Sequence, residues 1–176
     1  MEIYRGVRGA VGKDFPVLVK LNGADNLEGG LGPADALHAA MALDEEGIDA
    51  IEVSAGTPAS GDLSPVRPGS VAGKQEAFNL SLAGVIKKSV SCPVLTVGGI
   101  RSIEVAEEIL RKEEADYISL SRPFIREPGL AKRWQGGDRT PATCISCNGC
   151  FKPGLKEGGI YCVVDKIERE NREVSL

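Results

Sequence analysis

Four short apolar runs, separated by segments with helical periodicity, constrain the fold of this chain more than any other feature. The runs are FPVLVKLN (15–22), IDAIEVSAG (48–56), CPVLTVGGI (92–100) and ADYISLSRP (115–123). Continuous runs of Val, Ile and Leu of this length are typical of strands that are covered on both faces, as in parallel sheets. The sequence therefore predicts four strands of one parallel sheet.

Three segments between these runs have the periodicity of helices. They are GPADALHAAMALDEEG (32–47), KQEAFNLSLAGVIKKSV (74–90) and RSIEVAEEILRKEE (101–114). The spacing predicts that these apolar side chains face inward: Leu37, Met41, Leu43, Phe78, Leu82, Val85, Ile86, Ile103, Ala106, Ile109 and Leu110. Pro33 suits a helix start, Gly47 a helix end and Ser102 an N-cap. Alternating strands and helices predict an α/β fold with right-handed crossovers, either a doubly wound sheet or part of a (β/α) barrel.

Length and charge narrow the class of protein. A chain of 176 residues can form one domain with a substantial core. The net charge of −4, with acids and bases interspersed, argues against nucleic acid as a partner. No apolar run approaches the roughly 18 residues of a membrane span, and the N-terminus has no apolar signal region. We therefore expect a cytoplasmic protein with no membrane partner, in a compartment where disulfides are uncommon.

Glycines and an arginine follow the last two predicted strands. Gly98 and Gly99 lie in VGGI, and Arg122 lies in SRPF. Glycines let backbone N–H groups approach a phosphate, a following helix N-terminus favours negative charge, and a guanidinium offers a fork of donors. The Rossmann and Walker phosphate motifs are both missing. This pattern predicts a phosphate site, with an ordinary turn as the alternative.

Four of the five cysteines are closely spaced near the C-terminal end of the sequence. Their spacing is Cys144-x2-Cys147-x2-Cys150-x11-Cys162. Zinc ribbons more often use two separated Cys-x2-Cys pairs, whereas a compact triplet with one distant cysteine is closer to iron–sulfur ligation. The spacing favours an iron–sulfur cluster and leaves zinc and free thiols as alternatives. The fifth cysteine, Cys92, is expected to be a small buried hydrophobic residue.

Several motifs, in this order, resemble the C-terminal half of Old Yellow Enzyme-type NADH:flavin oxidoreductases. They are FPVLVKLNGADNLEGGL, GIDAIEVSAGT, PVLTVGGIRS and ADYISLSRPFIREP, and the resemblance extends from about residue 6 to residue 165. It implies half of an FMN-binding (β/α)8 TIM barrel, with the four runs as barrel strands five to eight. It also implies hydride transfer from NADH or NADPH through the flavin to a small-molecule electron acceptor.

The same resemblance implies the cofactor-binding residues. Lys20 would lie beside flavin N1 and O2 and stabilise the reduced ring, because a fixed cation there favours reduction. A lysine paired with an acid is the structural alternative. Gly98, Gly99 and Arg122 match the phosphate-binding positions of the family. Ser121 replaces the usual glycine before that arginine and keeps a backbone N–H.

The cysteines also match one branch of this family. In 2,4-dienoyl-CoA reductase and trimethylamine dehydrogenase, a similar set just after strand eight binds a [4Fe–4S] cluster. The resemblance therefore implies that Cys144, Cys147, Cys150 and Cys162 ligate such a cluster, with zinc as the alternative.

No catalytic residue can be assigned, because the residues that hold the substrate in this family lie on the first four strands. His38 is expected on a helix surface, and Tyr4, Tyr117 and Tyr161 do not match a proton donor. The alternative function is a non-catalytic, metal-stabilised half-barrel that binds a phosphorylated ligand or a partner.

The predicted organisation is a half-barrel over residues 1–135 and a Cys-rich cluster-binding segment with the C-terminal tail over 136–176. Half of a barrel leaves two sheet edges, at 17–21 and 117–121. We expect these edges to be covered by a second copy in a homodimer or by the missing N-terminal half-barrel.

Overall fold

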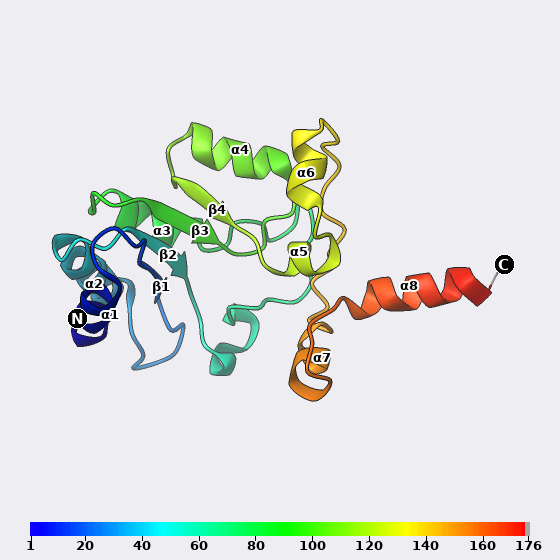
Figure 1. Cartoon of the computed structure of the whole chain (residues 1–176), viewed down its shortest axis with the longest axis horizontal. Coiled ribbons are helices and arrows are strands. Elements are labelled where there is room, and N and C mark those ends of the chain that lie inside the picture. Colours follow the sequence, from blue (N-terminus) through cyan, green and yellow to red (C-terminus); the bar gives the residue numbers. More distant parts are fainter. Residues whose placement is uncertain (175–176) are drawn as a thin grey trace. The chain divides into compact units, whose positions relative to one another are not determined.

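The computed structural model of the chain describes residues 1–174 and contains a four-stranded parallel sheet (Figure 1). The strands are β1 (Leu18–Asn22), β2 (Ala50–Ser54), β3 (Val94–Val97) and β4 (Tyr117–Ser119). They lie in the order β1-β2-β3-β4, and every neighbouring pair is parallel. The four predicted strands and their parallel pairing are confirmed.

Helices precede, separate and follow the strands. They are α1 (Glu2–Val11), α2 (Pro33–Glu45), the 3₁₀ helix η1 (Pro58–Leu63), α3 (Leu80–Lys87), α4 (Ile103–Arg111), α5 (Arg122–Arg126), α6 (Leu130–Gln135), α7 (Phe151–Lys156) and α8 (Val163–Val174). The three helices predicted between the strands correspond to α2, α3 and α4. The α2 helix begins at Pro33 and is followed by Gly47, whose φ of 82° is favourable for glycine.

The chain forms two compact units, and each unit contains segments that are separate in the sequence. The first unit consists of Met1–Pro65, Ala77–Gly98 and Ala106–Ser119. The second unit consists of Val66–Glu76, Gly99–Val105 and the chain from Leu120 onward. The boundary expected between residues 135 and 136 stays a prediction.

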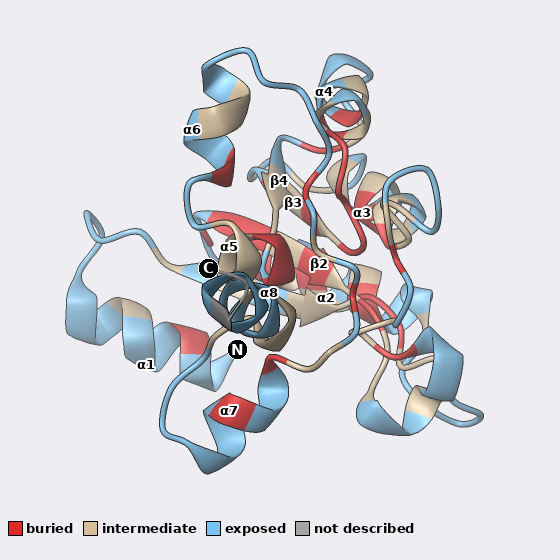
Figure 2. Cartoon of the chain, turned by 90° about the vertical axis from the view of Figure 1, so that its right-hand side faces the viewer, coloured by how far each residue is buried: buried red, intermediate tan, exposed pale blue. Residues whose placement is uncertain are grey.

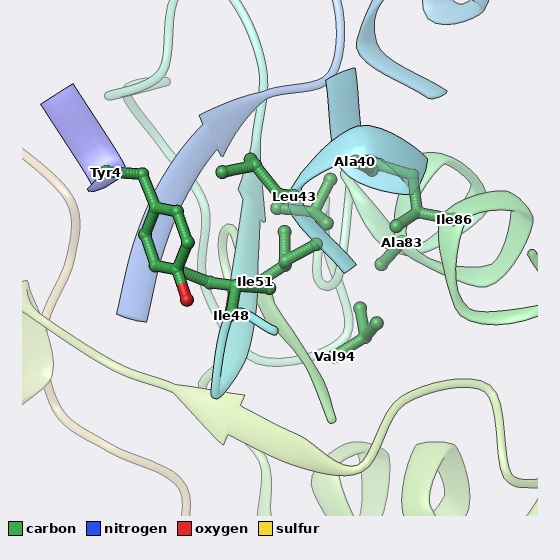
Figure 3. Close-up of a cluster of buried hydrophobic side chains, with 9 residues drawn as sticks. Tyr4, Ala40, Leu43, Ile48, Ile51, Ala83, Ile86 and Val94 are labelled. Carbon is green, nitrogen blue, oxygen red and sulfur yellow. The ribbon is translucent and has the colours of Figure 1, made fainter. Parts of the chain in front are cut away.

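The apolar core of the first unit lies between the sheet and helices α1, α2 and α3 (Figure 3). It consists of Tyr4, Ala40, Leu43, Ile48, Ile51, Val53, Ala83, Ile86 and Val94. Alternate residues of a strand point to one face of a sheet, which explains why Ile51 and Val53 of β2 are both fully buried. Buried positions, red in Figure 2, occur on β2 and α3 of this unit, and also on α5 and in residues 98–102.

Three of the side chains predicted to face inward are in fact largely exposed. Met41 is 42% exposed, Val85 50% and Leu110 41%. In α2 and α3 the positions in closest contact belong to small residues, since Ala40 and Ala83 are both 0% exposed. Periodicity locates the apolar face of a helix, but it does not show that alanines occupy the centre of that face.

The two outer strands, β1 and β4, form the edges of the sheet, as the sequence predicts. Leu18 on β1 is 53% exposed and Tyr117 on β4 is 58% exposed. We expect a second copy in a homodimer or an N-terminal half-barrel to cover these edges, and this stays a prediction. The assignment of the four strands to barrel positions five to eight also stays a prediction. Within the described residues, no helix has both the length and the apolar character that a membrane crossing requires.

Two neighbouring residues of α3 provide a test of this packing. Ile86 is 2% exposed and Val85 is 50% exposed. We expect Ile86→Ala to lower the free energy of unfolding by about 2–5 kcal/mol, because it leaves a cavity in the core. Val85→Ala should change it by less than about 0.5 kcal/mol. Urea denaturation followed by circular dichroism measures both, and equal losses in the two variants would contradict the packing.

Candidate cofactor site in the second unit

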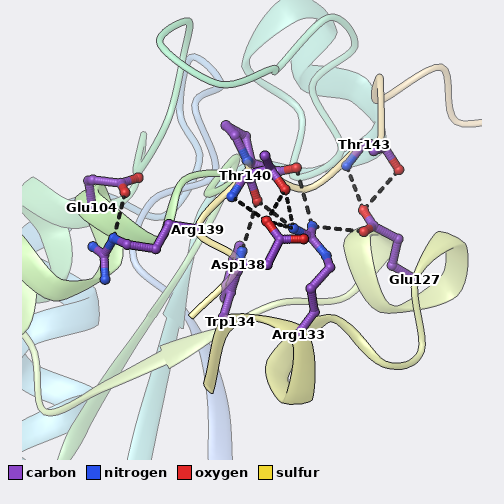
Figure 4. Close-up of polar contacts among 9 residues, drawn as sticks. Glu104, Glu127, Arg133, Trp134, Asp138, Arg139, Thr140 and Thr143 are labelled. Carbon is purple, nitrogen blue, oxygen red and sulfur yellow. Dashed lines mark hydrogen bonds and ion pairs between the residues drawn. The ribbon is translucent and has the colours of Figure 1, made fainter. Parts of the chain in front are cut away.

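The segment that leads from α6 to the first clustered cysteine is fixed by polar contacts (Figure 4). The Glu127 carboxylate accepts hydrogen bonds from the backbone N–H and the hydroxyl of Thr143, at 2.6 and 2.8 Å. Arg133 donates to Glu127 at 2.9 Å and to the carbonyl of Thr140 at 2.9 Å. The Trp134 indole N–H donates to that same carbonyl at 3.0 Å. These contacts determine where the chain enters the cysteine loop, which we define as residues 144–150.

A buried arginine holds the first half of the cysteine loop. Arg101 is 2% exposed, and its guanidinium donates to the carbonyl of Cys144 at 3.2 Å and to the hydroxyl of Ser146 at 2.6 Å. The Ser146 hydroxyl donates in turn to the carbonyl of Ser70 at 2.6 Å. Burial lowers the pKa of Arg101 from its ordinary value, which reflects the cost of placing a cation in the interior.

A second arginine holds the other half of the loop. Arg122, the first residue of α5, is 9% exposed and donates to Asn148 Oδ1 at 2.6 Å and to the carbonyl of Arg67 at 3.2 Å. The amide nitrogen of Asn148 donates to the carbonyl of Val66 at 2.8 Å. The arginine that the sequence assigned to a phosphate is therefore in direct contact with the cysteine loop.

All four clustered cysteines line one small cavity, with a volume of about 20 Å³. The remaining lining residues are Arg122, Ile125, Arg126, Ile145, Asn148, Val163 and Val164. Arg126 is anchored by two hydrogen bonds to the Glu168 carboxylate on α8, at 3.0 and 2.8 Å. The thiols thus share a site with two guanidinium groups and with apolar side chains.

The cysteines differ in their environments. All five are free thiols; Cys147 is exposed and Cys150 is buried. Burial raises the pKa of Cys150, and the nearby Cys144 and Cys147 raise it further. Gly149 allows the loop to approach the start of α8, because a Cβ there would lie 2.5 Å from Val163 Cγ2.

A metal centre fits the chemistry of this donor set, since four thiols and two cations share one cavity. Among the residues from 1 to 174, no three His, Cys, Asp or Glu side chains already form a group that could hold a metal ion. Ligation would therefore require the cysteine side chains to rearrange.

Lys20 lies in the first unit and has a partner. Its ammonium group forms an ion pair with Glu52 on the neighbouring strand β2, and Ser119 donates to the same carboxylate at 2.9 Å. The acid-paired lysine that the sequence left as an alternative is therefore present. The role of Lys20 beside a flavin stays a prediction.

The two glycines after β3 have the backbone geometry that favours glycine, with φ values of 137° for Gly98 and 76° for Gly99. A Cβ at Gly98 would lie 2.7 Å from the ring of Phe78, so packing alone requires a glycine there. Gly98 belongs to the first unit and Gly99 to the second. Ser121, next to Arg122, is exposed.

A carboxylate already occupies the start of α4, the helix that follows these glycines. Glu76 accepts from the backbone N–H groups of Arg101, Ser102 and Gly73, at 2.6, 2.8 and 2.8 Å, and from the Ser102 hydroxyl at 2.7 Å. Burial acts to raise the pKa of Glu76, but these hydrogen bonds outweigh it and the net effect is a lowered pKa. Because Glu76 already accepts from the backbone N–H groups of Arg101 and Ser102, a phosphate near the start of α4 would have to contact the N–H groups of Gly98 and Gly99 instead.

Sequence reasoning missed Glu76, which binds the start of α4. It also missed the contacts of Arg101, Ser146 and Asn148 in and around the cysteine loop. The sequence offered a local signal for Ser146 and Asn148, since both are polar residues that lie between the clustered cysteines. His38 is exposed on α2, as expected.

The fold and the cavity define a class of protein: an α/β protein with a partial parallel barrel, followed by a thiol-rich site. Residues 1–140 match the model of the NADH:flavin oxidoreductase / NADH oxidase family, and the chain belongs to this family. The resemblance seen in the sequence is thereby confirmed.

Curated relatives agree with this assignment. The chain is 35% identical over 155 residues to an NADH oxidase of Thermoanaerobacter brockii, covering 86% of the chain and 23% of that protein. It is 31% identical over 181 residues to a metal reductase of Desulforamulus reducens, covering 100% of the chain and 26% of that protein. The chain therefore spans about a quarter of the length of these relatives.

Solved structures show the same fold. A 2-naphthoyl-CoA reductase complex superposes with a TM-score of 0.72 at 27% identity, covering 85% of the chain and 22% of that protein. The 6-hydroxypseudooxynicotine amine oxidase of Pseudomonas geniculata superposes with a TM-score of 0.75 at 23% identity, covering 92% of the chain and 24% of that protein. At 23% identity, the second match supports the fold alone.

The hydrogen bonds to Glu76 predict a pH dependence of stability. A carboxylate whose folded pKa is lowered stabilises the fold above its ordinary pKa of 4.5, and this stabilisation is lost as the pH falls through the folded pKa. We expect Glu76→Gln to cost about 1–3 kcal/mol at pH 7. The difference from wild type should shrink below the ordinary pKa.

Urea denaturation at several pH values between neutral and strongly acidic conditions measures this difference. Glu28→Gln is the matched control, because Glu28 is exposed and its replacement should be neutral throughout. A difference between Glu76→Gln and wild type that stays constant down to strongly acidic pH would contradict the assignment.

Proposed function

We propose that this chain is the part of an FMN-dependent NADH:flavin oxidoreductase that holds the flavin phosphate and a [4Fe–4S] cluster. One observation carries this proposal: four thiols and the phosphate-position arginine, Arg122, line the same cavity. The match to the metal reductase covers 100% of the chain, so the segment with the cysteines lies within the region of similarity.

The cysteine residues would hold the cluster. Cys144, Cys147 and Cys150 approach from the loop, and Cys162 approaches from the residue before α8. Arg122 and Arg126 would compensate part of the negative charge that four thiolates bring, since opposite charges a few ångströms apart stabilise each other in a partly buried site. Val163 and Val164 would limit the access of water to the same cavity.

Backbone and guanidinium donors would hold the flavin phosphate. Arg122 offers N–H groups in a planar fork that matches two phosphate oxygens at once. Gly98 and Gly99 would let the backbone approach closely, and Ser121 would contribute its N–H and hydroxyl. Lys20 would face the pyrimidine edge of the ring and exchange part of its ion pair with Glu52 for this contact.

When bound, the flavin would supply hydride acceptance from NADH or NADPH, and the cluster would supply one-electron transfer. Relatives named NADH oxidase, metal reductase and NADPH dehydrogenase support NADH or NADPH as the donor and a small-molecule acceptor as proposals for the whole protein. The contribution of this chain would be to hold and orient both cofactors.

The first experiment tests the flavin phosphate site by titrating the 176-residue chain with FMN and with riboflavin, which lacks the phosphate. A hydrogen-bonded charge contributes about 1.5–3 kcal/mol, so Arg122→Ala should weaken FMN binding by about 10–150-fold. Riboflavin binding should be unchanged.

Arg126→Ala is the matched control, because Arg126 lines the same cavity but pairs with Glu168. It should retain the affinity for FMN. Equal FMN affinities of wild type and Arg122→Ala would rule out the phosphate assignment.

The second experiment tests the cluster by anaerobic reconstitution, followed by iron and sulfide analysis. We expect about four irons per wild-type chain and a clear loss in Cys147→Ser. Cys92→Ser should load normally, because Cys92 packs against the core of the first unit. A single zinc ion without sulfide would favour the zinc alternative instead.

A further inference from the structure

One side chain, Asn148, connects the proposed metal site at the cysteines with the proposed phosphate site at Arg122. Asn148 sits in the cysteine loop between Cys147 and Cys150, and its Oδ1 accepts the 2.6 Å hydrogen bond from Arg122. Its Nδ2 donates to the carbonyl of Val66 at 2.8 Å. Both polar atoms of the side chain are therefore engaged, and one of them orients the guanidinium.

The orientation of Arg122 depends on the position of this loop. Arg122 is 9% exposed, and its guanidinium donates to Asn148 Oδ1 and to the Arg67 carbonyl. An arginine binds two oxygens of an anion only when its planar fork has the correct orientation. A shift of the Asn148 side chain would therefore change how well Arg122 presents its remaining N–H groups.

The loop itself has an unusual backbone at this point. Asn148 has a φ of 60°, in the left-handed region that asparagine and glycine tolerate best. Cys147 precedes it directly and Cys150 follows two positions later, so a metal bound by both cysteines would fix the backbone on both sides of Asn148. Metal binding would thus reduce the number of conformations available to the acceptor of Arg122.

We propose that Asn148 is a positioning residue through which metal loading of the cysteine loop strengthens anion binding at Arg122. This inference rests on the proposed function, since it takes both the metal site and the phosphate site as given. Coupling between two sites is reciprocal, so a bound phosphate strengthens metal binding by the same factor. The two cofactors would then stabilise each other within one unit.

Ser146 provides the comparison within the same loop. Its φ of 56° is also positive, and its hydroxyl contacts Arg101 and the Ser70 carbonyl. Glycine accepts such φ values, so Ser146→Gly and Asn148→Gly both keep the turn and remove one side chain each. The two variants differ in which arginine loses its partner.

The experiment uses the 176-residue chain in two states, metal-free and loaded stoichiometrically with Zn²⁺ as the probe. The dissociation constants of FMN and riboflavin are measured in each state by fluorescence. For wild type we expect Zn²⁺ to strengthen FMN binding about fivefold or more, within the usual range of coupling, and to leave riboflavin unchanged. Asn148→Gly should show less than about a twofold effect, and Ser146→Gly, which removes a partner of Arg101 and leaves the acceptor of Arg122 in place, should show a larger effect than Asn148→Gly.

The outcomes separate this inference from the proposed function. FMN that binds more tightly than riboflavin but does not respond to Zn²⁺ overturns only the coupling. A full Zn²⁺ response in Asn148→Gly overturns the role of Asn148. If wild type binds FMN no better than riboflavin in both states, the proposed phosphate site and this inference fall together.

Discussion

The buried guanidinium of Arg101 is the interaction on which the second unit depends. Three oxygens accept its hydrogen bonds: the carbonyls of Ile100 and Cys144 and the hydroxyl of Ser146. The backbone carbonyl of Arg101 also accepts from the N–H of Ala142 at 2.8 Å. A buried cation is costly unless its donors are satisfied, so this set of contacts favours one arrangement of the loop over others. The first unit depends instead on apolar packing against its sheet.

The cysteine loop is surrounded by three arginines, and their positive charge favours an anion at this place. Arg101, Arg122 and Arg126 contact or line the region of the four thiols. Among the described residues, Arg126 is the only one of these three that pairs with a carboxylate. Cations with neutral partners in a partly buried place lose hydration without recovering a full counter-charge. An anionic occupant would restore that balance, and both thiolates and phosphate are anions. The electrostatics of the loop and the proposed cofactors are consistent with each other.

Much of the fold could be predicted from the sequence, because the information is local. The strands are short apolar runs, and the helix boundaries near Pro33 and Gly47 follow from backbone preferences. The exposure of Met41 and Val85 could not be predicted, since periodicity alone does not show that Ala40 and Ala83 are the residues that become fully buried. The cysteine set and Arg122 could be identified by spacing and resemblance. Their contact through Asn148 could not, because residues 26 positions apart meet only in the fold.

The interleaving of the two units has a consequence for how this chain can be divided. The polypeptide passes from one unit to the other five times, between residues 65 and 66, 76 and 77, 98 and 99, 105 and 106, and 119 and 120. A single cut anywhere between the first and last of these points leaves segments of both units on both fragments. The second unit, which contains the four clustered cysteines, therefore cannot be transferred to another protein as one continuous segment of sequence.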